Sequence, residues 1–146
     1  YSKNLRYLKK LDAKSNMVSE KWAIINLSSE EADVLERKIK VPKKITNFRK
    51  TLNEVFQLIK KNKLDGEKIL STLNSLNFFR NDIYLIDALN LLKETKIVND
   101  EKLSNWKVLI NKLKKVKIKS SGIAPVDIKE KLLQKRLKII MSHKNV

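Results

Sequence analysis

The chain has 146 residues, of which 33 are Lys or Arg and 16 are Asp or Glu, so its formal net charge at pH 7 is +17. The absence of cysteine excludes disulfides and cysteine-ligated zinc, and two glycines and two prolines are too few for the turns of a β-rich fold. No apolar run approaches the roughly 18 residues that a membrane-spanning helix needs. The composition therefore predicts an all-α protein without a transmembrane segment.

The positive charge is concentrated in blocks along the chain. Lys outnumbers Arg 28 to 5 and Asn occurs 14 times, a bias that an AT-rich genome also produces. The distribution is nevertheless uneven, because two segments between the blocks sum to −1 and −3. An excess of this size predicts an anionic partner, and phosphate is the foremost candidate. The basic blocks, with net charges of +4, +6, +7 and +4, are residues 1–16, 43–63, 102–119 and 120–146.

The first segment, residues 1–16, is predicted to be a basic arm. Within it, residues 3–12 favour a helix that is too short to be stable alone in water. The apolar run at 17–27 surrounds Trp22 and favours a second helix, although a short strand stays open as an alternative. These two segments lead into the central helical domain, which we expect to span 17–119.

A third helix is predicted from a capping signal. Ser28 is followed three residues later by Glu31, which is the spacing of a capping box, and acidic residues favour the first turn. This helix should continue to about Lys40. Pro42 then ends it, because the residue before a proline avoids helical backbone angles.

The centre of the chain carries the strongest helical periodicity and an internal repeat. Apolar residues recur at helical spacing in four stretches, separated by Asp65-Gly66, Asn81-Asp82 and Asn99-Asp100. Residues 56–64 align with 89–97 at an offset of 33, which is typical of solenoids built from helical hairpins. The alternative is chance similarity between two amphipathic hairpins of like composition. The predicted helix–turn–helix units are residues 47–80 and 81–116.

The last segment, residues 120–146, is predicted to be a basic C-terminal helix. Asp127 is its expected cap and Ser142 its approximate end. Basic residues are interleaved with apolar ones around this helix, so it lacks the two clean faces of a membrane-surface helix. The overall prediction is an all-α fold of stacked antiparallel helical hairpins with basic terminal extensions.

Three groups of basic residues are the candidate sites for contact with a nucleic acid. The densest lies at a helix end, where lysines either line a phosphate backbone or merely face solvent and the negative end of the helix dipole. The second opens a helix, where cations are disfavoured by the dipole and free N–H groups attract anions. The third lies on the last helix. The groups are Lys112, Lys114, Lys115, Lys117 and Lys119; Lys43, Lys44, Arg49 and Lys50; and Lys135 and Arg136.

No other pattern points to a site. The four phenylalanines lie at or near core spacing, and although Tyr7 and Tyr84 are freer, we assign no base-stacking residue. His143 is the single histidine and lacks neighbours that would make it a catalytic base or a metal ligand. Gly66 and Gly122 stand alone, so no phosphate-binding loop is present. We therefore expect no enzymatic activity, metal or cofactor.

The two units at 47–116 resemble the repeats of organellar RNA-binding proteins of the pentatricopeptide and octotricopeptide kind, in period and apolar pattern. The tetratricopeptide pattern W-x2-L-G-x2-Y is absent, and no base-reading pair recurs in both units, so no base-reading residue is carried over. The small, Lys-rich, helical profile is also similar to accessory proteins of mitochondrial ribosomes. These resemblances imply a mitochondrial or other organellar location; the cytoplasm and nucleus stay open.

The sequence thus predicts a non-enzymatic RNA-binding component of a ribosome or other ribonucleoprotein. Its partners would be RNA, foremost ribosomal RNA, and neighbouring proteins of the complex, with no small-molecule substrate. The Lys-to-Arg ratio favours contact with phosphates over base reading, which uses bidentate Arg. One alternative is an adaptor whose hairpins bind a partner helix. The other is a peripheral protein held to anionic membrane by its basic ends.

Overall fold

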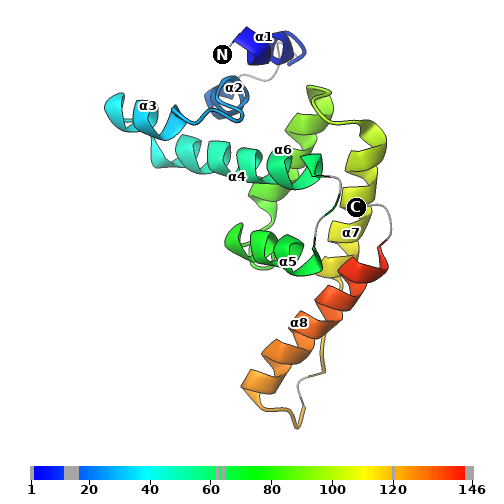
Figure 1. Cartoon of the computed structure of the whole chain (residues 1–146). Coiled ribbons are helices and arrows are strands. Elements are labelled where there is room, and N and C mark those ends of the chain that lie inside the picture. Colours follow the sequence, from blue (N-terminus) through cyan, green and yellow to red (C-terminus); the bar gives the residue numbers. More distant parts are fainter. Residues whose placement is uncertain (1, 12–16, 62, 64, 120, 144–146) are drawn as a thin grey trace.

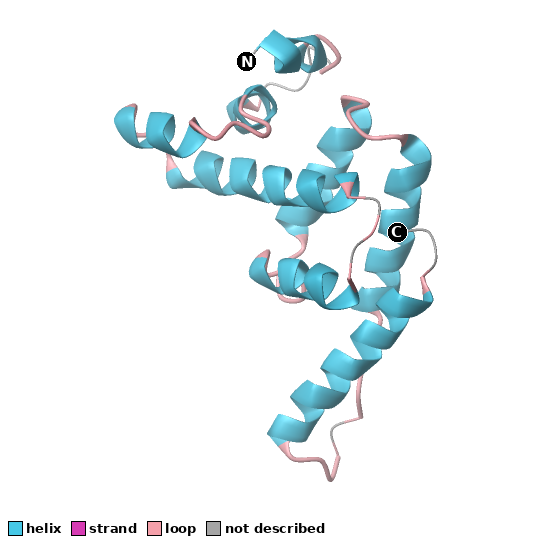
Figure 2. Cartoon of the chain, viewed as in Figure 1, coloured by secondary structure: helices cyan, strands magenta, loops and turns pink. Residues whose placement is uncertain are grey.

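A computed structural model describes residues 2–11, 17–61, 63, 65–119 and 121–143 of the chain. Every regular element in these residues is an α-helix, and no strand occurs among them (Figures 1 and 2), so the predicted all-α class is confirmed. No described helix is long and apolar enough to cross a membrane. The helices are α1 Ser2–Leu8, α2 Val18–Ile25, α3 Ala32–Lys38, α4 Lys43–Lys60, α5 Gly66–Ser75, α6 Ile83–Glu94, α7 Asp100–Lys114 and α8 Pro125–Ser142.

Two of the predicted helix starts are capped by side chains. Asp65 accepts a hydrogen bond from the backbone N–H of Glu67, and Asn99 accepts one from Glu101. Each cap satisfies one of the backbone donors that the first helical turn leaves without a partner. The chain therefore begins α5 and α7 at the breaks that the sequence indicates.

Two other predicted caps are wrong. Ser28 has a left-handed backbone φ of 59°, and its hydroxyl accepts a hydrogen bond from Gln57 of α4 instead of capping α3, which begins after Glu31. Asp127 lies inside the first turn of α8, and the residue at the cap position is Ala124. Pro125 occupies the first position of α8, where its fixed φ favours the start of a helix. Ser28 is instead held by hydrogen bonds with Asn53 and Gln57 of α4. The strand alternative for 17–27 is also wrong, because α2 is helical.

Helix α4 is the centre of the fold. It packs against α2 on one side and α6 on the other, and both contacts are more extensive than its contact with α5, the other helix of its predicted hairpin. Its buried apolar residues follow the predicted stripe and include Leu52, Val55 and Ile59. Trp106 and Leu109 of α7 are buried in the same core cluster. The sequence stripe thus identifies the face of α4 that carries the core.

Helix α8 closes the other end of the core. It contacts α5 and α7 through its C-terminal half, where Ile140 is buried. Gly66 of α5 lies at this contact, where a Cβ atom would be 3.4 Å from Cγ2 of Ile140, an ordinary van der Waals distance. The N-terminal half of α8 projects away from the body (Figure 1).

The two basic ends contribute to the fold and are not confirmed as free extensions. Leu11, within the predicted N-terminal arm, and Ile140, within the predicted last segment, both belong to the core cluster. Helix α1 is fixed to the end of α2, because the Asn4 side-chain amide donates hydrogen bonds to the carbonyls of Ile25 and Leu27, each at 3.0 Å. The parts of the predicted arm and last segment at 1, 12–16, 120 and 144–146 lie outside the described residues.

Candidate nucleic-acid interface

The projecting half of α8 and the chain that precedes it form one basic feature, which we call the C-terminal basic arm and define as residues 112–119 and 125–138. After α7 the chain runs beside α8 in the opposite direction (Figure 1). Lys135 Nζ donates a hydrogen bond of 3.5 Å to the carbonyl of Lys117. The arm has ten basic residues against two acidic ones, Asp127 and Glu130. The fold therefore brings together two groups of lysines that lie apart in the sequence.

Most of the predicted arm lysines project into solvent. Lys112, Lys115, Lys117, Lys119 and Lys135 are all exposed. A row of exposed ammonium groups on an extended arm suits contact with successive phosphates, because Lys is a flexible point charge that needs no fixed geometry.

The side chains of Lys114 and Arg136 interact with other groups of the protein. Lys114 forms an ion pair with Asp82, whose pKa this hydrogen bond lowers, although the Lys114 side chain stays 46% exposed. The Arg136 guanidinium lies 3.6 Å from the ring centroid of Phe79. Burial lowers the pKa of Arg136, but an arginine side chain stays positively charged at neutral pH. Arg136 therefore holds α8 on the body, and only part of it is accessible to a ligand.

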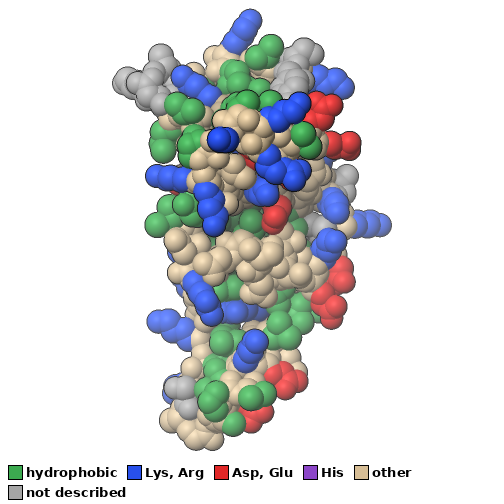
Figure 3. Space-filling model, turned by 90° about the vertical axis from the view of Figure 1, so that its left-hand side faces the viewer, with side chains coloured by type: hydrophobic (Ala, Val, Ile, Leu, Met, Phe, Trp, Pro, Cys, Tyr) green, Lys and Arg blue, Asp and Glu red, His purple; other side chains and the backbone are tan. Residues whose placement is uncertain are grey.

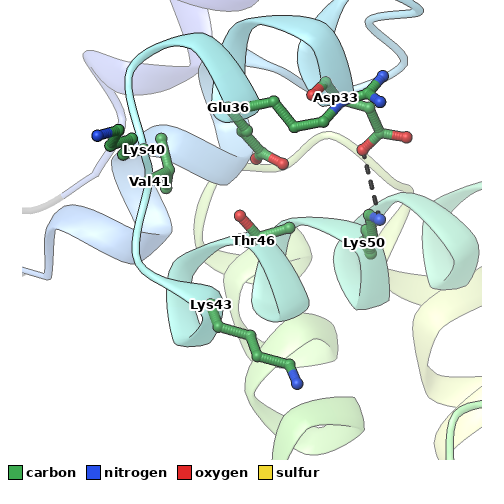
Figure 4. A pocket seen from close by; sticks show the side chains of 8 residues that line it. Asp33, Glu36, Lys40, Val41, Lys43, Thr46 and Lys50 are labelled. Atoms are coloured by element: carbon green, nitrogen blue, oxygen red, sulfur yellow. Dashed lines mark hydrogen bonds and ion pairs between the residues drawn. The ribbon is translucent and has the colours of Figure 1, made fainter.

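The basic group at the start of α4 lines a separate pocket of about 570 Å³ (Figure 4). Lys43 and Lys50 belong to it, but Lys44 lines a different groove. The sequence analysis missed two further cations of this pocket, Arg37 in the last turn of α3 and Lys40 in the turn that follows it. They carry no periodic signal of their own, and only the turn between α3 and α4 places them beside Lys43.

Arg49 is a structural residue, so its assignment as a contact to nucleic acid is corrected. Its side chain is 5% exposed, and Nε and Nη2 donate to the two oxygens of Glu36 at 2.7 and 2.9 Å. Nη2 also pairs with Asp33. Trp22 Nε1 donates to the same Glu36 carboxylate at 2.9 Å. This network joins α2, α3 and α4, and with its side chain only 5% exposed Arg49 offers little surface to a ligand.

The carboxylates of this network determine how stability responds to acid. Burial alone raises the pKa of Glu36, but hydrogen bonds from Arg49 and Trp22 and the charge of Arg49 outweigh it, so the net pKa lies below the ordinary 4.5. For Asp33 the pairing with Arg49 and Lys50 likewise exceeds the effect of desolvation and lowers the pKa below 3.8. Both shifts favour the ionised, folded form.

We therefore expect the stabilisation from Glu36 to be complete above about pH 5, which exceeds the pKa of this carboxyl in the unfolded chain. It should be lost as the pH falls through the lower pKa of the folded state. Urea unfolding followed by circular dichroism from about pH 6 to about pH 3 checks this. Self-repulsion of the basic chain also grows in acid, so the control is the double variant Glu36→Leu, Arg49→Met. An identical pH dependence in the two proteins would contradict the role given to Glu36.

The two groups of accessible cations lie far apart. The start of α4 is beside α3, whereas the arm projects from the opposite end of the molecule (Figure 1). Basic side chains are spread between the two ends on the face shown in Figure 3. An extended polyanion, and not a small ligand, is the kind of molecule that could contact both groups at once.

The phenylalanines and His143, which the sequence does not assign to a site, have structural contacts. Phe48 and Phe78 are buried, as core residues should be. His143 Nε2 donates to the carbonyl of Asn105 at 3.2 Å. Among the residues that the structure describes, no three His, Asp or Glu side chains gather into a possible metal site.

Comparison of the chain with protein-family models, with characterised proteins and with solved structures finds no match.

Proposed function

We propose that this protein is a non-enzymatic RNA-binding component of a ribonucleoprotein, with the ribosome of a mitochondrion or another organelle as the foremost candidate. The C-terminal basic arm would contact RNA phosphates, and the cations around the start of α4 would contact a second stretch of the same RNA. Neighbouring proteins of the complex would cover other faces.

One observation carries this proposal, namely the pairing of the 112–119 segment with α8. Ten basic residues with two acidic ones on a projecting arm create a strongly positive potential, which self-repulsion disfavours unless a polyanion offsets it. A nucleic acid supplies regularly spaced phosphates along such an arm. Lys predominates among these cations, which supports positioning on the backbone and gives no support to base reading by the arm.

A different observation favours the alternative of a protein-interaction adaptor. Met17 and Ile83 are 54% and 60% exposed and line a groove of about 290 Å³ between α2, α4 and α6. Glu20 and Asp87 lie at the same groove, so its surroundings are less basic than the arm. An adaptor would use this groove for an apolar side chain of a partner helix, and its binding would resist both nuclease and high salt.

Sedimentation of the tagged chain from cell extract, with and without ribonuclease, tests the proposed function. An RNA-binding component should sediment with a large particle and move to the top of the gradient after ribonuclease treatment. It should also leave the particle at high salt, because phosphate contacts are salt-sensitive. Sedimentation that neither ribonuclease nor salt changes would overturn the proposal in favour of the adaptor.

A further inference from the structure

A second groove, of about 760 Å³, combines aromatic rings with cations at the other end of the molecule from the arm. It lies between α1, the end of α2, the end of α4 and the turn between α6 and α7 (Figure 1). Tyr7 and Phe56 supply its aromatic rings. Lys3, Arg6 and Lys60 supply its positive charges.

Each ring of this groove already carries a cation. The Arg6 guanidinium carbon lies 4.8 Å from the ring centroid of Tyr7, and Arg6 Nη2 donates to the Tyr7 hydroxyl at 2.8 Å. Lys60 Nζ lies 5.8 Å from the ring centroid of Phe56. Such contacts are weak at exposed sites, so a ligand with its own π-face can replace the cation on a ring.

Both rings are held in place from behind. Tyr7 and Phe56 are half-buried and pack against the core cluster, while the rest of their surface lines the groove. Helix α1 is held beside the end of α2, because the Asn4 amide donates hydrogen bonds to the carbonyl of Ile25, the last residue of that helix, and to that of Leu27 in the turn after it. The groove therefore presents preformed aromatic surfaces, which lowers the entropic cost of binding a flat ligand.

We propose that this groove binds unpaired nucleotides of RNA, with bases stacked on Tyr7 and Phe56 and the adjoining phosphates paired with Lys3, Arg6 and Lys60. The inference rests on the proposed function and deepens it by adding single-stranded RNA to the class of ligand. A base that stacks on the face of Phe56 releases Lys60 toward a phosphate. The exchange loses the cation–π contact of Lys60 and gains a base-stacking contact and a phosphate contact.

The acidic wall of the groove gives the bound nucleotide a direction. Glu30 and Glu31 line the groove together with Ser28 and Ser29. Carboxylates repel phosphate but accept hydrogen bonds from ribose hydroxyls and base amino groups. Repulsion from Glu30 and Glu31 therefore adds to the attraction of the phosphates to Lys3, Arg6 and Lys60, and the groove favours RNA over DNA through the ribose 2′-hydroxyl.

The test uses the whole chain with a short oligouridylate and with an RNA duplex as probes. Tyr7→Leu and Phe56→Leu keep an apolar side chain against the core, and Tyr84→Leu changes an exposed tyrosine of the other groove as the matched control. Thermal melting establishes that each variant is folded. Ultraviolet cross-linking to the oligouridylate, followed by mass spectrometry, identifies the residues in contact with bases.

We expect Tyr7→Leu and Phe56→Leu each to weaken oligouridylate binding by about five- to one-hundredfold, to leave duplex binding unchanged, and to remove cross-links at the groove. Tyr84→Leu should change neither affinity. If the oligouridylate binds but all three variants bind it equally and cross-links lie elsewhere, the groove is not a base-binding site while the proposed function stands. Failure of both probes to bind at low salt would overturn both.

Discussion

Replacing Arg49 with methionine should destabilise the fold by about 3–5 kcal/mol, because it leaves the Glu36 carboxylate buried without its cation. Glu36 is 5% exposed, and Trp22 and Thr46 would remain as its side-chain hydrogen-bond partners but neither supplies a positive charge. A loss of this size is a large fraction of the stability of an ordinary domain and lowers Tm by on the order of 10 °C. Urea unfolding monitored by circular dichroism measures it.

The double variant Glu36→Leu, Arg49→Met separates charge burial from lost packing. Apolar groups of similar volume remove the cost of the isolated carboxylate, so the double variant should recover most of the stability lost in Arg49→Met. Its RNA affinity at a temperature where it is folded should match that of the original chain. A double variant less stable than Arg49→Met, or one that loses RNA affinity, would contradict the structural role of Arg49.

Neutralising the C-terminal basic arm should have the largest effect on RNA binding. In the variant Lys117→Gln, Lys119→Gln, Lys135→Gln, three exposed cations are removed without touching the core. Each lost phosphate contact lowers the slope of log K against log salt by about 0.7 for single strands, so the slope should fall by about 2. Affinity should weaken to a similar extent for RNAs of unrelated sequence. Filter binding across a salt series measures both quantities.

The matched control removes the same charge from elsewhere on the surface. Lys21, Lys68 and Lys93 are exposed, and they lie in the segments of the chain that carry no net positive charge. The variant Lys21→Gln, Lys68→Gln, Lys93→Gln should keep a slope close to that of the original protein. If the slope of log K against log salt falls by the same amount in both triple variants, the RNA is attracted by the general positive charge of the protein and not by the arm.

The helices could be predicted from the sequence because their signals are local. The apolar stripe of α4 and the side-chain caps at Asp65 and Asn99 depend on residues within a few positions of each other. The failed cap at Ser28 depends on distant groups. Ser28 has the right neighbour for a capping box, but Asn53 and Gln57 of α4 bind its backbone N–H and its hydroxyl. A tertiary hydrogen bond therefore overrides the local motif.

The candidate site was predictable as a set of charges but not as an arrangement. The basic blocks of the sequence identify Lys117 and Lys135 as candidate contacts. That the two residues lie close together depends on the reversal of the chain before α8, which the sequence does not reveal. Arg49 and the exposed Lys50 are adjacent basic residues in the same block, so the sequence does not distinguish them. Only the burial of Arg49 beside Glu36 in the fold shows that their roles differ. Tyr7 and Phe56 lie far apart in the sequence, so no periodicity could have placed them in one groove.

The salt dependence of RNA binding by the purified chain tests the central claim most directly. Affinities for two RNAs of unrelated sequence are measured across a salt series in the absence of other proteins. Log K should fall linearly with log salt for both RNAs, with a slope of about −2 or steeper and nearly equal affinities. A flat salt dependence, or no binding at the lowest salt concentration, would contradict the account.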